Sequence, residues 1–383
     1  MRVLHTADWH LGRIFYGVHL TEDQAYVLDR LIEIVQDAHP DVVIVAGDIY
    51  DRAVPPQDAV SLLDDVLSRL VAKVGVLVVL IAGNHDSPER LSFGARLLAN
   101  SNLHVFGPLL PECRPVVIED HSGPVNIYAI PFAEPSVVRE KIGGDDIRDQ
   151  DSALRQILQH IRAKQPANRR SILVAHAAVV GGKTSDSERP LSIGGSETVD
   201  PAIFEGFDYV ALGHLHQPQS SGEDHIQYSG SILKYSFSEV SHQKSVTIVE
   251  MDVNGKCNIE RIALRPRRDV RRLEGTLEEI LEKARSDENQ DDYIMVTLLD
   301  RQPVLNAIGR LREVYPNTLH IERPLFAPST VNAQAPADHL RLSEAEMFSS
   351  FFSQVTGDEM TEPETQAFAN IVETLRRRER EAI

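Results

Sequence analysis

The sequence predicts an α/β fold, because short apolar runs rich in β-branched residues alternate with longer segments whose apolar residues recur at helical spacing. Each apolar run is typical of a buried strand, and a polar group directly follows each one. Since α/β folds gather functional groups in the loops after their strands, the same pattern predicts where a site would lie. The predicted strands cover Val3-Leu4 and residues 42–46, 76–82, 172–175 and 209–212.

Three amphipathic helices are predicted between these strands. The first begins at Thr21, which has the spacing of a capping box with Gln24. The second covers residues 58–71, and the third precedes the strand at 172–175. We expect their apolar faces to pack on the sheet. Those faces consist of Leu28, Leu31, Ile32 and Val35 in the first helix, Leu62, Leu63, Val66, Leu67 and Leu70 in the second, and Leu154, Ile157, Leu158 and Ile161 in the third.

Five short motifs that end apolar runs supply the nitrogen and oxygen ligands that two neighbouring divalent cations need. One histidine or one Gly-Asp turn would carry little weight, since most such residues are structural. Here five separate strand ends each carry a polar group that is costly to bury without a partner, so we predict a metal centre. The motifs are Asp8-Trp9-His10, Gly47-Asp48, Gly83-Asn84-His85-Asp86, His176 and Gly213-His214-Leu215-His216.

The ligands divide into two sets. Asp8 and His10, two residues apart at a strand end, point to one face and can hold a first cation together with His216. Asp48 can bridge both cations, because a carboxylate has two oxygens. The ligands assigned to the second cation are Asn84, His176 and His214.

His85 and Asp51 are predicted to act on the substrate rather than on the cations. His85 adjoins Asn84 and is interpreted as a group that contacts the phosphate or protonates the leaving oxygen. Asp51 can orient His85 and keep it protonated, or it can simply cap the following turn. The sequence leaves both roles open.

Two further segments have open interpretations. The long loop between His176 and Tyr209 contains two glycine pairs, and it is either a functional or mobile loop or a disordered surface excursion. An arginine run near residue 265 is either a solvated linker or a set of contacts to DNA phosphates. The candidate DNA contacts are Arg265, Arg267, Arg268, Arg271 and Arg272.

The rest of the chain is predicted to form a small α+β unit, a linker and a helix pair. The unit has strands at 293–298 and 318–321 and a helix at 302–314. Two short amphipathic helices, beginning near Ser343 and Pro363, cannot bury much against each other, so they are a docking element for a partner or a cap on the main domain. The candidate partner contacts are Phe348, Phe351, Phe352, Phe368 and Ile371, and the predicted domains are 1–265, 266–326, a linker at 327–340, and 341–383.

Composition predicts a cytoplasmic protein that lies outside the membrane. The 383 residues can bury a large core, and the longest apolar run is far too short to cross a bilayer. No signal peptide is expected, because Asp8 and His10 already belong to the predicted site. Cys113 and Cys257 form no metal or redox spacing, which indicates a reducing compartment. The net charge of −18 opposes general attraction to nucleic acid, so a DNA substrate needs a local basic surface, the cations or a partner.

The five motifs, with Asp51 after Gly47-Asp48, resemble the full signature of the calcineurin-like metallophosphoesterases. Longer runs narrow the resemblance to the SbcD nuclease subunits of bacteria, and with the order of the domains it covers nearly the whole chain. These runs are Leu4 to Gly12, Val45 to Asp51, Ala82 to Ser87, Ala211 to His216 and Tyr228 to Ser231.

This resemblance implies a four-layer αββα phosphoesterase domain, a DNA-contacting cap domain, and helices that dock on the coiled-coil base of an SbcC-like SMC-family ATPase. It also implies two manganese ions per chain, exonuclease action on duplex DNA ends, endonuclease action on single strands and hairpins, and a homodimer formed through the nuclease domain. The chain departs from archaeal relatives, which have a histidine where Asp51 stands. The exonuclease role of that histidine in the archaeal relatives is therefore not assigned to Asp51.

Two other functions are compatible with the site motifs. One is a metallophosphoesterase that acts on a cyclic nucleotide or a phosphoprotein, although such an enzyme has no evident need for residues 266–383. The other is a non-enzymatic scaffold on the same fold, although the complete ligand set and His85 argue against it. Metal content and a nuclease assay on single-stranded DNA would separate the three functions.

Overall fold

The computed structural model describes residues 1–166, 169–191, 197–324, 348–349, 352–353 and 360–381. The chain divides into two compact units, Met1–Arg271 and Arg272–Ile383, which are described separately below. Among the described residues, no helix is long and apolar enough to cross a membrane.

The first unit contains two six-stranded mixed sheets, and the five predicted strands are confirmed as β1, β4, β5, β9 and β12. Within each sheet these strands run parallel to one another, so their carboxyl ends share one edge. In spatial order the first sheet is β16 (Cys257–Ala263), β15 (Ser245–Met251), β1 (Arg2–Thr6), β4 (Val42–Ala46), β5 (Leu77–Ile81) and β6 (Leu103–Phe106). The second is β13 (Gln219–Ser221), β14 (Glu223–Tyr228), β12 (Tyr209–Gly213), β9 (Arg170–His176), β8 (Gly123–Ala129) and β7 (Val116–Asp120).

The core of this unit lies between the two sheets. Ile44 and Ile81 from the first sheet pack with Ile172 and Ala211 from the second, and all four are fully buried. A strand that is covered on both faces needs apolar residues at successive positions. These strands therefore appear as continuous apolar runs in the sequence.

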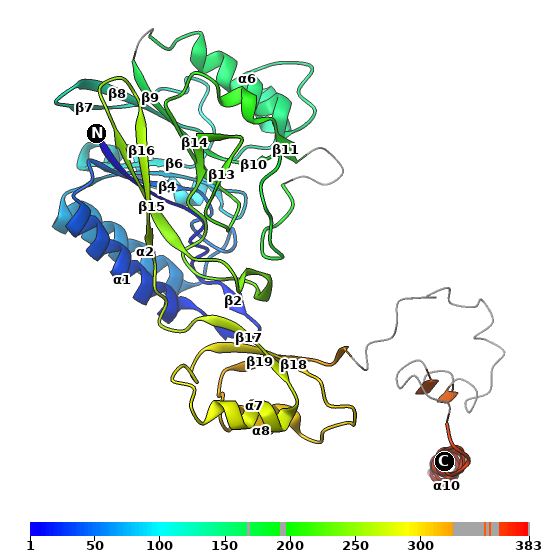
Figure 1. Cartoon of the computed structure of the whole chain (residues 1–383). Coiled ribbons are helices and arrows are strands. Elements are labelled where there is room, and N and C mark those ends of the chain that lie inside the picture. Colours follow the sequence, from blue (N-terminus) through cyan, green and yellow to red (C-terminus); the bar gives the residue numbers. More distant parts are fainter. Residues whose placement is uncertain (167–168, 192–196, 325–347, 350–351, 354–359, 382–383) are drawn as a thin grey trace. The chain divides into compact units, whose positions relative to one another are not determined.

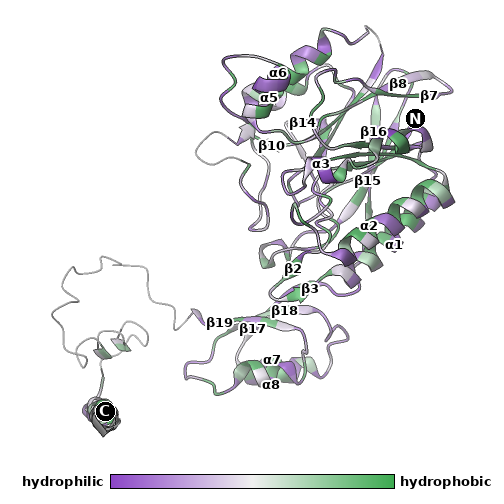
Figure 2. Cartoon of the chain, turned by 180° about the vertical axis from the view of Figure 1, so that it is seen from behind, coloured by the Kyte–Doolittle hydropathy of each residue, from purple (hydrophilic) through white to green (hydrophobic). Residues whose placement is uncertain are grey.

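Helices cover the outer faces of the sheets and complete the four αββα layers. Figure 1 shows α1 (Thr21–Ala38) and α2 (Gln57–Ser68) on one side of the paired sheets and α6 (Gln150–Arg162) on the other. Hydrophilic and hydrophobic residues alternate around α1 and α2 in Figure 2, as the sequence pattern predicts. The expected four-layer fold is confirmed.

The predicted capping box at the start of α1 is wrong. The helix is preceded by Leu20 without a side-chain cap, and the Thr21 hydroxyl donates to Asp58 instead. Gln24 is fully buried, and its amide donates to the carbonyl oxygens of Trp9 and His10, at 3.1 and 2.7 Å. The side chain that the sequence assigned to the helix start thus holds the loop that carries Asp8 and His10.

The second unit has its own core and a three-stranded sheet. Leu277, Val296 and Leu311 are buried together there. The helix predicted at 302–314 begins later, at Ala307, because Asn306 has a left-handed backbone that a helix cannot include. The predicted linker at 327–340 lies outside the described residues, and the predicted domain boundaries stay predictions. The elements are β17 (Val270–Gly275), α7 (Leu277–Ala284), β18 (Tyr293–Leu298), α8 (Ala307–Arg312), β19 (Thr318–Glu322) and α10 (Glu362–Glu381).

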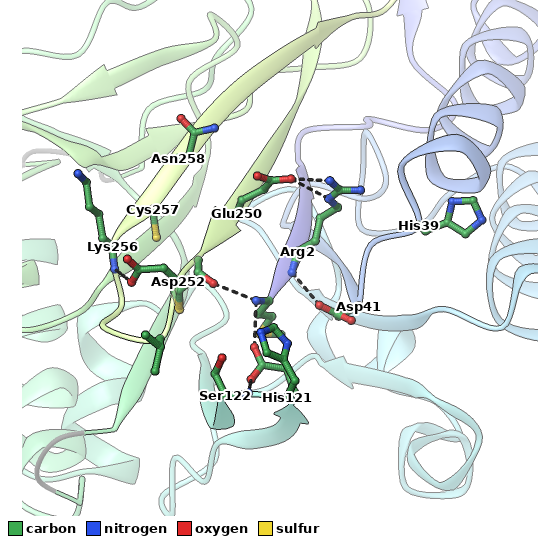
Figure 3. A pocket seen from close by; sticks show the side chains of 14 residues that line it. Arg2, His39, Asp41, His121, Ser122, Glu250, Asp252, Lys256, Cys257 and Asn258 are labelled. Carbon is green, nitrogen blue, oxygen red and sulfur yellow. Dashed lines mark hydrogen bonds and ion pairs between the residues drawn. The ribbon is translucent and has the colours of Figure 1, made fainter.

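A polar pocket of about 890 Å³ lies at the amino-terminal end of β1 (Figure 3). Arg2 donates to Glu250 through its guanidinium at 2.5 Å and to Asp41 through its backbone N–H at 2.7 Å. Since Asp8 follows the other end of β1, this pocket is separate from the predicted metal centre.

Candidate metal centre

All seven predicted metal ligands lie at the edge where the carboxyl ends of the two sheets meet. Loops after β1, β4 and β5 contribute one group of ligands, and β9 and the loop after β12 contribute the other. Six of the seven are buried and Asn84 is half-buried. The residues from the first sheet are Asp8, His10, Asp48 and Asn84, and those from the second are His176, His214 and His216.

Four of these ligands have a left-handed backbone, which residues other than glycine rarely adopt. The φ angles of Asp8, His10 and Asp48 are 52°, 45° and 47°, and that of His214 is 106°. Such backbone strain persists only where the surrounding fold enforces it, and it gathers at functional sites. The strain therefore indicates that the fold holds these side chains in fixed positions at a cost in local backbone stability.

Glycines let the ligand loops approach more closely than other residues allow. A Cβ atom on Gly213 would lie 1.8 Å from the carbonyl oxygen of Ala46, and one on Gly83 would lie 2.1 Å from an Asp48 carboxylate oxygen. A larger residue at Gly213 would separate the two sheets, and one at Gly83 would displace the Asp48 carboxylate, so both glycines are predicted to be required by packing.

The second ligand set is centred on His176. Its Nδ1 faces the Ala46 carbonyl oxygen at 3.0 Å, which places the Nδ1 proton there. The other ring nitrogen, Nε2, lies 2.9 Å from Asn84 Oδ1 and 3.5 Å from Asp48 Oδ2. The ring of His214 lies 5.4 Å from that of His176. Nε2 of His176, Oδ1 of Asn84 and Oδ2 of Asp48 thus lie close together, with the His214 ring beside His176.

The first ligand set is centred on His10. Its Nε2 lies 3.0 Å from Nε2 of His216 and 3.6 Å from Asp48 Oδ2. Asp8 accepts the backbone N–H of His214 on both carboxylate oxygens, at 2.9 and 3.1 Å, which links it to the other sheet. One carboxylate oxygen of Asp48, Oδ2, therefore faces both sets, while Oδ1 accepts the backbone N–H of His85 at 2.9 Å, and the bridging role stays a prediction.

Burial and neighbouring charges have opposing effects on the pKa values of these groups. Burial raises the pKa of Asp8 to about 7. Burial alone would lower the pKa of His176, but the neighbouring Asp48 carboxylate raises it to about 9. Burial also tends to raise the pKa of Asp48, but His176 and other histidines hold it well below its usual range. The cluster is thus built around negative charge on Asp48.

His85 lies beside the cluster in an orientation fixed by main chain. Its Nδ1 faces the backbone carbonyl oxygen of Asp51 at 2.8 Å, and its Nε2 lies 3.9 Å from Asp48 Oδ2. The Asp51 carboxylate is paired with Arg13 at 2.7 Å and lies 3.6 Å from His10 Nδ1. Asp51 therefore contacts His85 through its backbone, while its side chain supports His10 and Arg13.

The sequence motifs gave no role to Asp86, although it connects two of the ligand loops. Its buried carboxylate accepts backbone N–H groups of Ile49, Tyr50 and Gly83 at 2.9 to 3.1 Å. Burial, followed by the neighbouring Asp48 charge, raises the pKa of Asp86 to about 7. The sequence signal that could have found it is its place directly after Asn84-His85.

The donor set fits divalent cations. His176 Nε2 and Asn84 Oδ1 face each other at 2.9 Å, and two lone pairs at that distance need a positive charge between them. A second proton on the imidazole can supply that charge, and a cation can replace the proton. Asp8, Asp48 and His176 also place ligand atoms within 4.8 Å of one another, as do His10, Asp51 and His85.

The candidate DNA contacts differ in their surroundings. Arg265, Arg267 and Arg272 are exposed, although Arg267 lies 3.8 Å from Glu22. Arg268 is half-buried and forms an ion pair with the buried carboxylate of Asp23 at 2.9 Å. That ion pair gives the guanidinium a structural role, and the assignment of Arg268 as a DNA contact stays a prediction.

The candidate partner contacts are only partly described. Phe348 and Phe368 stack with ring centroids 4.0 Å apart, and Phe352 lies 6.5 Å from Phe348. Ile371 on α10 is exposed, and Phe351 lies outside the described residues. The two helical segments thus contact each other through aromatic rings.

Comparison with known proteins identifies the class. Residues 1–218 match the calcineurin-like phosphoesterase family, and residues 266–356 match a family described as type 5 capsule protein repressor C-terminal domain. The SbcD subunit of the nuclease SbcCD from Staphylococcus saprophyticus is 35% identical over 375 residues, which are 98% of this chain and 98% of that protein. The chain therefore belongs to the calcineurin-like phosphoesterases and, within them, to the SbcD nuclease subunits, as the resemblance implied.

Two solved structures are more distantly similar. A dimetal phosphatase from Danio rerio has 12% identity and a TM-score of 0.38, covering 69% of this chain and 98% of its own. The protein TT1561 of Thermus thermophilus has 12% identity and a TM-score of 0.41, covering 69% of this chain and 99% of its own. At these values neither structure bears on the function of this chain.

Cation binding should strengthen as the pH rises. With pKa values of about 7 and 9, Asp8 and His176 hold protons that a cation must displace. Each displaced proton makes the affinity rise about tenfold per pH unit below the pKa of its group. Titration of the metal-free protein with Mn²⁺ from pH 6 to 8, by calorimetry in two buffers, should show this rise and proton release. An affinity independent of pH would contradict it.

Proposed function

We propose that this chain is the nuclease subunit of an SbcCD-type complex that processes DNA ends, and that it hydrolyses phosphodiesters with two manganese ions. The observation that carries the proposal is the pair of ligand sets that share Asp48, with Nε2 of His85 turned toward the same carboxylate. The name of the staphylococcal relative, a subunit of the nuclease SbcCD, supports the substrate class.

The proposed catalytic roles follow from the site geometry. Divalent cations held by the seven ligands would polarise the phosphate and lower the pKa of a bound water. The Asp51 carbonyl holds His85 through Nδ1, so only Nε2 can reach the substrate. Burial lowers the pKa of His85, whereas the negative charge of a bound phosphodiester favours the protonated ring that donates to the leaving oxygen.

Manganese is the proposed metal because of the mixture of ligands. Imidazole nitrogens outnumber carboxylates in the two sets, and no thiolate is present among the seven ligands. Magnesium favours oxygen ligands and retains its water, while thiolates would favour zinc. We also place the protein in the cytoplasm, where the free thiols of Cys113 and Cys257 would stay reduced.

An exposed apolar surface supports the proposed homodimer. Phe93, between the short helices α3 (Pro88–Leu91) and α4 (Ala95–Leu98) of the nuclease unit, is 88% exposed, and Leu97 within α4 is 80% exposed. Large apolar side chains gathered on a surface favour protein contacts. We therefore propose these helices as part of the dimer interface.

Substitution of Asp48 and of His85 should separate metal binding from chemistry. Asp48→Asn removes negative charge shared by both cations, so both should bind more weakly. His85→Ala should keep both Mn²⁺ ions while cleavage of single-stranded DNA falls by about 100-fold or more. Metal content and a nuclease assay in Mn²⁺ measure the two effects. Equal loss of metal in both variants would show that His85 is a ligand.

The exposed arginines should contribute to DNA binding through phosphates. Arg265→Ala and Arg267→Ala together should weaken binding regardless of sequence, and each lost contact should lower the slope of log affinity against log salt by about 0.9. Arg268 is left unchanged, because its replacement would also break the ion pair with Asp23. Hydrolysis of a small chromogenic phosphodiester serves as the control. An unaltered salt slope would make this run a solvated linker.

Truncation after residue 330 should separate catalysis from assembly. Both units keep their cores, because the core of the second unit ends at Ile321. The shortened chain should still nick single-stranded DNA in Mn²⁺, but it should no longer co-purify with an SbcC-like ATPase. Retained ATPase binding would show that another part of the chain binds the ATPase.

The shortened chain should also remain a dimer in sedimentation, and Phe93→Arg introduced into the shortened chain should give monomers.

A further inference from the structure

A buried ion pair lies directly behind the first ligand set. Glu239 is fully buried, and its Oε2 accepts from Nζ of Lys244 at 2.6 Å. The other donors of Lys244 reach the carbonyl oxygen of His216 and the hydroxyl of Ser231, both at 2.8 Å. All three ammonium protons are therefore used. A buried ion pair is often no more stable than an apolar pair of similar volume, so this pair calls for a further explanation.

The second oxygen of Glu239 determines the proton position on His216. It accepts the hydroxyl proton of Ser187 and lies 3.3 Å from His216 Nδ1. The Ser187 hydroxyl oxygen also lies 2.5 Å from that nitrogen. Because a carboxylate only accepts and the serine proton is already donated, the hydrogen between Ser187 and the ring must come from His216 Nδ1. The lone pair of the neutral ring is then on Nε2.

This lone pair is the one that the metal centre needs. Nε2 of His216 faces Nε2 of His10 at 3.0 Å, on the side of Asp48. A histidine with its proton on Nε2 would point an N–H group at the first cation position instead. A carboxylate behind a metal-binding imidazole fixes the tautomer and the ring orientation.

The network also gives a role to the described part of the long loop after β9. Ser187 contributes the hydroxyl, and the carboxylate of Glu188 accepts the backbone N–H of His216 at 2.8 Å. Glu188 in turn accepts from the backbone and hydroxyl of Ser185, at 2.5 and 2.8 Å. The segment around residues 185–188 therefore holds both the ring and the main chain of one ligand.

We infer that Glu239, supported by Lys244 and relayed by Ser187, is a positioning residue that presents Nε2 of His216 to the first cation. This inference rests on the proposed two-metal function. It adds that the first cation position depends on Glu239, Lys244 and Ser187 more strongly than the second position does. In the second set, Asn84 and His176 are held by each other and by the carbonyl oxygen of Ala46.

Manganese binding to the full chain tests the inference. Glu239→Gln should weaken the first Mn²⁺ by about 10- to 100-fold, and Ser187→Ala by about tenfold, with the second Mn²⁺ within about twofold of the unaltered chain. Ser238→Ala is the matched control, because the Ser238 hydroxyl contacts the same segment through the backbone N–H of Asp186 at 3.0 Å and contacts Ser236, rather than Glu239, Ser187 or His216. At one equivalent of Mn²⁺ per chain, the spin-coupled electron paramagnetic resonance signal of a manganese pair should be lost in Glu239→Gln and Ser187→Ala. The same signal should be retained in the control.

A second measurement distinguishes this inference from the proposed function. In metal-free protein with ¹⁵N-labelled histidine, the neutral ring of His216 should carry its proton on Nδ1, and Ser187→Ala should mix the two tautomers. An Nε2 proton in the unaltered chain would overturn the inference whatever the metal content. Equal weakening of both cations, or unchanged affinity in both variants, would also overturn it. Failure of the unaltered chain to bind two Mn²⁺ would instead overturn the proposed function.

Discussion

The carbonyl oxygen of Ala46 is the point on which the whole site depends, because the two sheets meet there. The end of β12 approaches it so closely that Gly213 leaves no room for a Cβ atom, and Nδ1 of His176 binds it at 3.0 Å. One backbone group therefore sets the distance between the sheets and the orientation of a ligand. Asp48 follows two residues later, so the bridging carboxylate is placed by the same contact.

The site is assembled at a cost in local stability that a bound cation can offset. Left-handed backbone at Asp8, His10 and Asp48, together with buried charge, is unfavourable in isolation. The apolar layer between the sheets, whose residues are buried, holds these loops in place. Metal binding then contributes folding free energy, because the ligands converge only in the folded chain.

Features that depend on residues close together in the sequence were predictable, whereas contacts between residues far apart in the sequence were not. Strands buried on both faces give continuous apolar runs, so the ligands after β1, β4 and β5 were predictable from their neighbours. Gln24 was misassigned because its partners, the carbonyl oxygens of the Asp8 loop, are neighbours only in the fold. Arg268 and Asp23 are 245 positions apart in sequence, and no local pattern reveals such a pair. The contact between Ser187 and Glu239 was unpredictable for the same reason.

The charge of the chain connects metal loading with substrate binding. At −18 the protein repels a polyanion at long range, and the protons held on Asp8 and His176 leave the metal-free site with little net charge to attract a phosphate. Two divalent cations would displace these protons and make the local charge positive, because their charge exceeds that of the Asp8 and Asp48 carboxylates. In the proposed mechanism, a phosphodiester is therefore attracted to the site only after both cations are bound. This order protects the buried site from unproductive anion binding, and it leaves the attraction of DNA from a distance to exposed arginines or to a partner.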